Sequence, residues 1–373
     1  MQKQLKPPLL IDLPLLISAF SLVCFSLVMI YSTTAVVSTE RFGDAYFYVK
    51  RQGVAVVIGL LGLFACTRMS IETIRRSAPW CLFAALALIL ITFIPGIGRS
   101  SGGAQRWINL PFLSFQPAEL AKILFVIFLA GFFERRKDRL DSFWLSVALP
   151  LFFVVCLAAL LLKQPDFGSS AIITVVALSM ILAVGVRMRY LLIAALPLCL
   201  AVVALVVTSP YRLKRIVTFL SPGEDVLGRG YQLTQSLIAV SRGGFSGEGL
   251  GDSMQKLHFL PAAHTDFIFA VVAEELGFVG AMVLVVAFLV VLWRGFGIAS
   301  KMVPDLFTYT FAVGLTMLLV APALVNVGVV TGMLPTKGLV LPLVGYGGSS
   351  MICSLVAIGL LLTLARHQYR NAV

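Results

Sequence analysis

The chain has 373 residues, of which 59% are hydrophobic and only 12% are charged, and its mean hydropathy is +0.99. Water-soluble globular proteins are about 45–50% apolar, so this composition excludes a soluble globule. The formal net charge of +12 raises the question of a nucleic-acid partner. The basic residues are spread through short connections without a clustered patch, so we expect no nucleic acid and predict an integral membrane protein.

Several apolar runs reach the length of about 20 residues that a helix needs to cross a bilayer, and they lack the short alternation of a transmembrane barrel. We therefore predict an all-α membrane protein that forms a single polytopic domain over residues 1–373 with ten transmembrane helices. The predicted spans are Pro14 to Val36, Gln52 to Cys66, Ala78 to Pro95, Pro117 to Phe133, Trp144 to Leu162, Gly168 to Gly185, Tyr190 to Thr208, Phe267 to Trp293, Leu306 to Val330 and Ser350 to Ala365.

Basic residues indicate the orientation of these spans. If the N-terminus is cytoplasmic, most basic residues of the short connections fall on the inside, including the cluster from Arg135 to Arg139. Cytoplasmic connections carry such an excess, so we expect both termini in the cytoplasm. Residues 209–266, between spans seven and eight, then form a large extracytoplasmic loop. Within it, Tyr231 to Ser241 has an apolar face formed by Leu233, Leu237, Ile238 and Val240, which predicts a helix lying at the membrane surface.

Residues 331–348 are apolar but are interrupted by Pro335, Pro342 and several glycines, so they cannot form an unbroken helix. Non-helical backbone at membrane depth is tolerated only when it is buried in protein or lines a wet cavity. We predict a re-entrant or pocket-lining loop on the outer face. The alternative is an irregular connection without a function.

The large loop meets the eighth span at His264, Thr265 and Asp266. A carboxylate placed where water gives way to hydrocarbon loses part of its hydration, which makes it a better proton acceptor at neutral pH. Asp266 is therefore a candidate general base. The alternative is that Thr265 or Asp266 caps the following helix, a commoner role for these residue types.

Charged side chains inside spans indicate function by default. Glu119 and Lys122 are three residues apart on one face of the fourth span, where they can form a structural ion pair or contact a substrate. Asp166, at the outer end of a span, is either a helix cap or a ligand. The histidines have no paired spacing typical of a metal site, so metal ligands stay unassigned.

Ordered motifs run through nearly the whole chain: GAQRWINL at Gly103 to Leu110, QPAELAK at Gln116 to Lys122, QPDFG at Gln164 to Gly168, YRLKRIVTFLSP at Tyr211 to Pro222, GRGYQLTQSLIA at Gly228 to Ala239, LPAAHTDFIFAVVAEELG at Leu260 to Gly277 and LPTKGLVLPLVGYGGSS at Leu334 to Ser350. Together they resemble the SEDS family (shape, elongation, division and sporulation). The likeness is closer to its division-type branch, FtsW, than to its elongation-type branch, RodA.

The resemblance implies a peptidoglycan glycosyltransferase that polymerises lipid II at the outer face of the membrane by an inverting displacement, with Asp266 as the general base. It places Arg106, Gln116, Glu119, Lys122 and Asp166 along the substrate cavity, with His264 and Thr265 beside the base. The diphosphate would be held by cations, for which the candidates are Arg212, Arg215, Lys256 and Lys337. A divalent cation, Mg²⁺ or Mn²⁺, is a further expectation, although His258 and Ala262 stand where the branch often has acidic residues.

The family also implies partners and a place in the cell. We expect contact with lipid II, the growing glycan strand and membrane lipid, a class B penicillin-binding protein that cross-links the strands, and other division proteins. The expected location is the cytoplasmic (inner) membrane at the division septum. Two other functions stay open on the sequence: a lipid II flippase, for which Glu119 and Lys122 would suit a polar path, and a non-catalytic scaffold.

Overall fold

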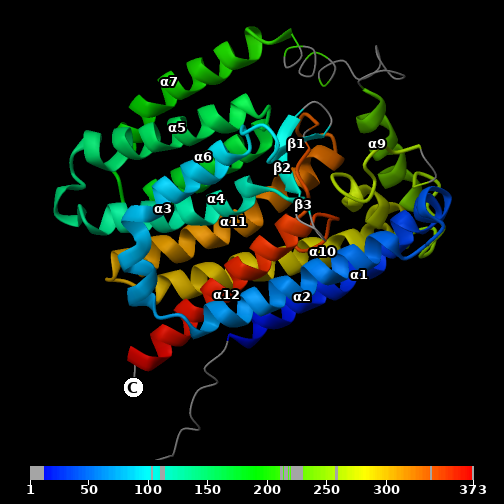
Figure 1. Cartoon of the computed structure of the whole chain (residues 1–373), viewed down its shortest axis with the longest axis horizontal. Coiled ribbons are helices and arrows are strands. Elements are labelled where there is room, and N and C mark those ends of the chain that lie inside the picture. Colours follow the sequence, from blue (N-terminus) through cyan, green and yellow to red (C-terminus); the bar gives the residue numbers. More distant parts are fainter. Residues whose placement is uncertain are drawn as a thin grey trace, which may run out of the picture.

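The structure, a computed structural model, describes residues 12–101, 104–109, 114–210, 230–256, 259–336 and 338–371, with the single residues 213, 217 and 219. Most of it consists of long helices that lie side by side (Figure 1). In chain order they are α1 (Leu13–Phe42), α2 (Phe47–Arg68), α3 (Ile71–Ile91), α4 (Pro117–Glu134), α5 (Leu149–Lys163), α6 (Phe167–Ala183), α7 (Met188–Val207), α9 (Tyr231–Gly243), α10 (Ile268–Ser300), α11 (Leu306–Val330) and α12 (Gly348–Asn371). A 3₁₀ turn, Lys137–Arg139, and a π turn, Trp144–Ala148, lie between α4 and α5.

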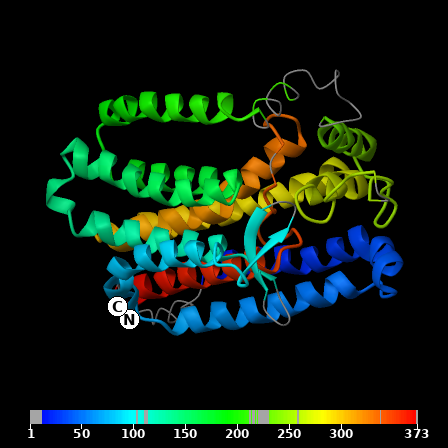
Figure 2. The same ribbon diagram turned by 45° about the horizontal axis from the view of Figure 1, so that its top comes forward.

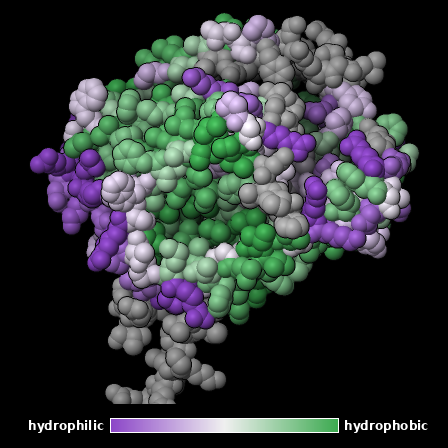
Figure 3. Space-filling view, viewed as in Figure 1, coloured by the Kyte–Doolittle hydropathy of each residue, from purple (hydrophilic) through white to green (hydrophobic). Residues whose placement is uncertain are grey.

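Seven helices in the described part of the chain are long and apolar enough to cross a membrane: α1, α2, α3, α5 with the π turn before it, α10, α11 and α12. α6 and the first part of α7 are shorter apolar helices. Hydrophobic residues cover the middle of the face shown in Figure 3, and hydrophilic residues gather toward its two ends. The chain is a multi-pass, mainly helical membrane protein, and the number of ten spans stays a prediction.

The most enclosed helices are α4, α11 and α12. Phe125, Phe132 and Phe133 of α4 are fully buried, and about three quarters of the apolar windows of α11 and α12 are buried, 72% and 78% respectively. α7 lies at the edge of the bundle (Figures 1 and 2). These three helices therefore form the centre of the bundle, where lipid cannot reach.

Ion pairs join the helices at one end of the bundle. Arg294, near the end of α10, binds Asp12, the N-cap of α1, with 3.0 Å between Nε and Oδ1. Arg75 of α3 binds Glu134 at the end of α4 at 3.0 Å and Asp305 before α11 at 2.5 Å. These contacts identify the end at which α1, α3 and α11 begin, and the cavity described below lies toward the other end.

A small sheet between α3 and α4 was not anticipated by the all-helical prediction. Its strands β1 (Gly98–Ser101), β2 (Ala104–Asn109) and β3 (Ser114–Phe115) are antiparallel in the order β1-β2-β3. Ser349 at the start of α12 fixes its edge, because the Ser349 hydroxyl donates to the Ser114 carbonyl at 3.2 Å and accepts from the Gln116 N–H at 2.7 Å. β1 and β3 are short, and the sequence of β2, AQRWIN, does not alternate between apolar and polar residues, so no strand could be recognised in the sequence.

The helix predicted at Tyr231 to Ser241 is present as α9, and its contact with the membrane surface stays a prediction. It buries Leu233, Ser236 and Ala239, and the Ser236 hydroxyl donates to the Val330 carbonyl of α11 at 3.0 Å. Leu237, predicted to share the apolar face, is 39% exposed. α9 therefore packs on the protein through Leu233, Ser236 and Ala239 and leaves Leu237 and Ile238 exposed.

α10 is broken at Gly277, whose φ and ψ are 66° and −165°. A break at membrane depth leaves backbone groups unpaired, which costs several kcal/mol for each group in hydrocarbon. The segment after α9 pairs with them. Its amides donate to the carbonyls on one side of the break, and its carbonyls accept from the amides on the other: Glu248 N to Glu274 O and Gly249 N to Glu275 O, both 3.0 Å, Phe278 N to Gly244 O, 2.9 Å, and Val279 N to Phe245 O, 3.2 Å.

Gly277→Ala should destabilise the protein strongly. A side chain disfavours φ of +66°, and a Cβ at this position would lie 2.3 Å from the Gly247 amide nitrogen, so we expect a loss of about 2 kcal/mol or more. The measurement is the thermal midpoint in detergent. Gly297→Ala, in the same helix with nothing within 4 Å of the added Cβ, is the control, and an equal midpoint for the two variants would contradict the prediction.

Candidate active site

A polar cavity of about 520 Å³ lies between α2, the sheet, α4, α6, the start of α10, α11 and the segment 338–350. The prediction that residues 331–348 line a pocket agrees with this placement, because Gly338, Leu339, Val340, Pro342 and Tyr346 are on the cavity wall. The cavity also brings together most of the predicted site residues: Arg106, Gln116, Glu119, Lys122, Asp166, His264, Thr265 and Asp266. These residues come from segments up to 160 positions apart in the sequence.

Glu119 and Lys122 form a charged pair on the cavity wall. The Lys122 Nζ lies 2.8 Å from the Glu119 Oε1, and the Lys122 side chain is only 6% exposed. A buried charge without a partner is costly, so each of the two side chains requires the opposite charge of the other to be stable at its buried position in α4. The two sequence interpretations are therefore compatible: the residues form an ion pair, and both line the cavity.

Asp166 caps α6 and faces the cavity at the same time. Its Oδ1 accepts from the Ser169 N–H at 3.1 Å, and its Oδ2 accepts from the Ser169 hydroxyl at 2.8 Å and the Gln116 amide at 3.3 Å. Arg106 donates to the carbonyls of Gln164 and Pro165 just before it. The QRW and QPD motifs are thus joined by side chain–backbone bonds, and the Asp166 carboxylate already accepts several hydrogen bonds.

Asp266 lies directly before α10, but the cap interpretation is wrong. The N-cap position belongs to Phe267 and has no side-chain hydrogen bond, and the Thr265 hydroxyl donates to the Ala262 carbonyl at 3.2 Å. The Asp266 carboxylate lies instead against the Gly338 backbone, since a Cβ at position 338 would be 3.0 Å from its Oδ2. Asp266 is therefore held at the cavity wall between the two outer segments.

His264 is packed among aromatic rings beside Asp266. Its ring centroid is 5.3 Å from that of Tyr48 and 5.7 Å from that of Tyr346, and the Tyr346 N–H donates to the His264 carbonyl at 2.9 Å. Burial, assisted by the positive charge of Arg41, lowers the pKa of His264 to about 4. The imidazole is therefore neutral at pH 7, which suits a wall residue and not a cation that holds an anionic substrate.

The depressed pKa of His264 predicts a loss of stability in mild acid. The unfolded chain takes up a proton on this imidazole below its ordinary pKa of 6.5, whereas the folded protein does so only near pH 4. Stability should therefore fall as the pH falls from about 6.5 toward 5. The measurement is the thermal midpoint between pH 7.5 and 5. His264→Gln, which cannot titrate, should flatten the dependence, and an unchanged slope in this variant would contradict the assignment.

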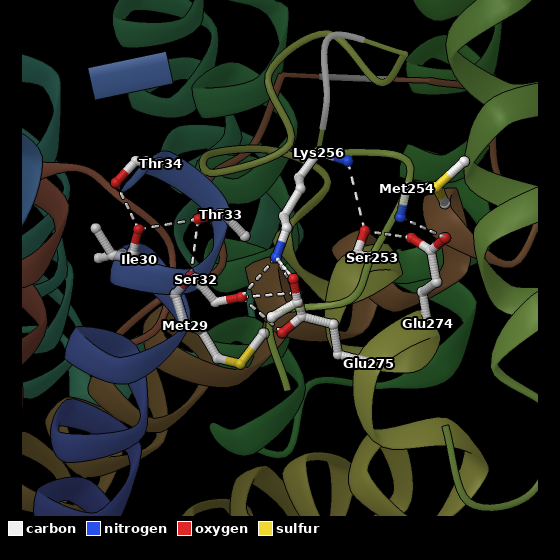
Figure 4. A network of polar contacts seen from close by, with 11 residues as sticks. Met29, Ile30, Ser32, Thr33, Thr34, Ser253, Met254, Lys256, Glu274 and Glu275 are labelled. Atoms are coloured by element: carbon white, nitrogen blue, oxygen red, sulfur yellow. Dashed lines mark hydrogen bonds and ion pairs between the residues drawn. The ribbon is translucent and has the colours of Figure 1, made fainter. Parts of the chain in front are cut away.

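Lys256, predicted to hold the diphosphate, does not reach the cavity. Its ammonium is buried and lies 2.9 Å from the Glu275 Oε1, 2.5 Å from the Gly251 carbonyl and 3.3 Å from the Ser32 hydroxyl. Figure 4 shows the Lys256 side chain pointing toward Ser32 and Glu275. The two oxygens of Glu275 also accept from Ser32 of α1 at 2.6 and 2.8 Å. The pair joins the outer loop to α1 and α10, a structural role.

Glu274 completes the same network. It accepts from the Ser253 hydroxyl and from the Met254 N–H at 3.2 Å (Figure 4). Two buried carboxylates in succession, 0% and 1% exposed, thus hold residues 253–256 against the broken part of α10. Glu275 also bonds the neighbouring helix α1, through Ser32.

Removing Lys256 alone should destabilise the protein more than removing the whole pair. Lys256→Met leaves the Glu275 carboxylate buried without its cation, and such a change costs about 3–5 kcal/mol. The double variant Lys256→Met/Glu275→Gln removes both charges and should recover most of the thermal midpoint. If the double variant were as unstable as the single one, the ion pair would not be the interaction that Lys256 provides.

Three further predicted residues, Arg212, Arg215 and Lys337, lie outside the residues that the structure describes, as does His258. The structure adds two cations that the sequence analysis did not select, Arg51 and Arg99, both of which line the cavity. Arg51 stands next to the first residue of the predicted second span. A basic residue at the outer mouth of a span, against the usual charge bias, could have identified it.

The described residues do not form a protein-only metal site. Within the described part of the chain, no group of three or more His, Cys, Asp or Glu side chains is placed to hold a metal ion. Glu119 is engaged by Lys122, and Asp166 by α6 and Gln116. These residues therefore fit a divalent cation only when a phosphorylated ligand supplies part of its coordination. Mg²⁺ is commonly bound in this way.

The sequence is similar along almost its whole length to one family of proteins. Residues 13–370 match the family described as "Cell cycle protein", named for FtsW, RodA and SpoVE. A relative from Geobacter metallireducens, described as a probable peptidoglycan glycosyltransferase FtsW, is 42% identical over 357 residues, covering 95% of this chain and 94% of the relative. A relative with the same description from Hahella chejuensis is 41% identical, covering 95% and 90%.

Solved structures share the fold. One, described as showing the structural coordination of polymerization and crosslinking by a peptidoglycan synthase complex, has a TM-score of 0.79 and 31% identity and covers 96% of this chain and 99% of that chain. The rod shape determining protein RodA of Thermus thermophilus has a TM-score of 0.69 and 28% identity, covering 98% and 99%. The likeness therefore includes the region of the cavity as well as the helical frame.

Proposed function

This chain belongs to the cell cycle protein family of FtsW, RodA and SpoVE, and we propose that it is a peptidoglycan glycosyltransferase of cell division in which Asp266 is the general base. The observation that supports the assignment of the base is the position of Asp266 on the cavity wall, against the backbone of Gly338. Glu119 is neutralised by Lys122, and Asp166 accepts hydrogen bonds at the start of α6. Asp266 lies at the wall formed by the two outer segments, where a carboxylate can accept a proton from a substrate hydroxyl bound in the cavity.

The reaction needs one base and stabilisation of a leaving anion. In lipid II the donor sugar is α-linked to a diphosphate, and the glycan product is β-1,4-linked, so a single inverting displacement is sufficient. The 4-hydroxyl oxygen of the acceptor attacks C1 of the donor sugar, the bond from C1 to the diphosphate oxygen breaks, and Asp266 takes the hydroxyl proton. A base positioned within hydrogen-bond reach contributes about 10²–10⁴-fold in rate.

The leaving diphosphate is the second requirement, and the cavity supplies cations for it. Arg51, Arg99 and Arg106 all line the cavity. Guanidinium groups match phosphate geometry by paired hydrogen bonds, and fixed positive charges stabilise the anion that develops as the bond breaks. These arginines replace Lys256 in the proposal, because the Lys256 ammonium is bound by Glu275. A divalent cation, Mg²⁺ or Mn²⁺, would enter with the diphosphate and add to this charge.

We further propose that the protein acts with a class B penicillin-binding protein and other division proteins at the septum, in the cytoplasmic membrane. Support for a cross-linking partner comes from the likeness to the peptidoglycan synthase complex that coordinates polymerization and crosslinking. In the proposed topology both termini are cytoplasmic and the cavity opens at the outer face, where the lipid substrate reaches it sideways from the bilayer. α1 begins at the end of the bundle away from the cavity, which supports that orientation.

The test is polymerisation of lipid II by the purified protein with its partner in detergent. Asp266→Asn should lower the rate by about a hundredfold or more, because the amide cannot accept the proton. Asp252→Asn, the same change at an exposed residue outside the cavity, should leave the rate unchanged. Parallel reactions with a chelator and with added Mg²⁺ or Mn²⁺ determine the contribution of the divalent cation.

A parental rate in folded Asp266→Asn would overturn the assignment of the base. If the parent protein with its partner formed no glycan at all, the enzymatic function itself would be wrong, and a flippase would be the better reading. Polymerisation requires no sidedness and so proceeds in detergent, whereas flipping requires a membrane with two faces.

A further inference from the structure

Asn326 of α11 is a buried polar residue that contacts both outer segments beside the cavity. It is 2% exposed, and its side-chain nitrogen donates two hydrogen bonds, to the Asp266 carbonyl at 2.7 Å and to the Leu339 carbonyl at 2.9 Å. An amide nitrogen carries two hydrogens, so both are used. Asn326 itself is not on the cavity wall, and it can affect the reaction only through the segments that it holds.

The two segments have little regular structure at this point. Asp266 lies in the turns before α10, and Leu339 lies in the non-helical stretch between α11 and α12. A further bond links the same segments on the other side of Asp266, from the Tyr346 N–H to the His264 carbonyl. Asn326 therefore anchors two irregular segments to the enclosed helix α11, a rigid part of the bundle.

This anchorage determines the place of the Asp266 carboxylate. The carboxylate lies against Gly338, the residue before Leu339, with so little space that an added Cβ would be 3.0 Å from its Oδ2. The separation between the Asp266 backbone and the 338–339 backbone thus fixes how far the carboxylate extends into the cavity. Misplacement of a reacting group by about 1 Å can cost a hundredfold in rate.

We propose that Asn326 is a positioning residue of the active site: its carboxamide holds Asp266 and the backbone at Gly338 and Leu339 at the separation required for proton transfer. The proposal rests on the function proposed above for Asp266. Asparagine suits the task because one nitrogen provides two donors at the end of a short side chain. Leucine of similar size provides none, aspartate turns the donors into acceptors facing two carbonyl oxygens, and glutamine places them one methylene further from α11.

A positioning role and a purely structural role predict different kinetics. If Asn326 only stabilised the fold, the molecules that remain folded would work at the parental rate. If it positions Asp266, folded molecules should bind lipid II normally but turn it over slowly, so kcat should fall while KM changes little. A suitable comparison is Thr363, a 2% exposed residue of α12 whose hydroxyl donates to the Cys66 carbonyl of α2 at 2.8 Å. Like Asn326, it donates from a buried side chain to a backbone carbonyl of a distant segment, and it does not line the cavity.

The experiment measures kcat, KM for lipid II and the thermal midpoint of Asn326→Leu, Asn326→Gln and Thr363→Val, with Asp266→Asn as the inactive reference. We expect kcat of Asn326→Leu and Asn326→Gln to fall about tenfold or more, with KM within about twofold of the parent. Thr363→Val should lose thermal stability with an unchanged kcat. Gly338→Ala, which leaves Asn326 in place and presses a methyl group on Asp266, should also lower kcat, and it tests the same geometry if the Asn326 variants do not fold.

A parental kcat in a folded Asn326 variant would overturn the proposal. The proposal would also be wrong if Thr363→Val lost as much thermal stability as the Asn326 variants and its kcat fell by the same factor. If none of the Asn326 variants folds, a parental kcat in Gly338→Ala overturns it. These results differ from failure of the proposed function, in which the parent forms no glycan or Asp266→Asn keeps the parental rate. The positioning role alone is wrong when Asp266→Asn is inactive and an Asn326 variant has the parental kcat.

Discussion

The break of α10 at Gly277 is the constraint on which the site depends. In a membrane the four backbone groups around the break need partners, and the segment after α9 supplies all of them. The same segment continues to Ser253 and Lys256, which bind the buried carboxylates Glu274 and Glu275. The first part of α10 is thereby fixed to the outer loop and to α1, and Asp266 stands directly before it.

The cavity contains several ionisable groups, and most of them already serve the fold. Glu119 and Lys122 neutralise each other in the enclosed helix α4, and Asp166 starts α6. Burial keeps His264 neutral. Such pairing is required because isolated charges at this depth are costly. The ion pair and the capped aspartate therefore shape a polar wall, and Arg51, Arg99 and Arg106 add positive charge to it.

The two outer segments that carry Asp266 and Gly338 are held by side chains and not by regular secondary structure. Asn326 of α11 binds both segments, and Gln52 of α2, fully buried, lies 3.4 Å from the Gly345 carbonyl and the Gly347 amide. Irregular backbone in a membrane protein needs such donors and acceptors from its rigid neighbours. Because side chains of rigid helices hold it, a cavity wall without regular secondary structure can still keep a side chain at a fixed position.

The sequence by itself determined the class of protein, the positions of the long helices, the break between Thr331 and Gly348, and the placement of Glu119 and Lys122 on one helix face, because hydropathy, proline and helical spacing are local properties. It also selected most of the charged residues that meet in the cavity. Only the tertiary structure decided that Lys256 faces Glu275, that Arg51 and Arg99 join the cavity wall, and that Asn326 holds Asp266. Each of these facts depends on which distant segment packs against the residue. A local sequence pattern does not show which group a buried polar side chain will contact.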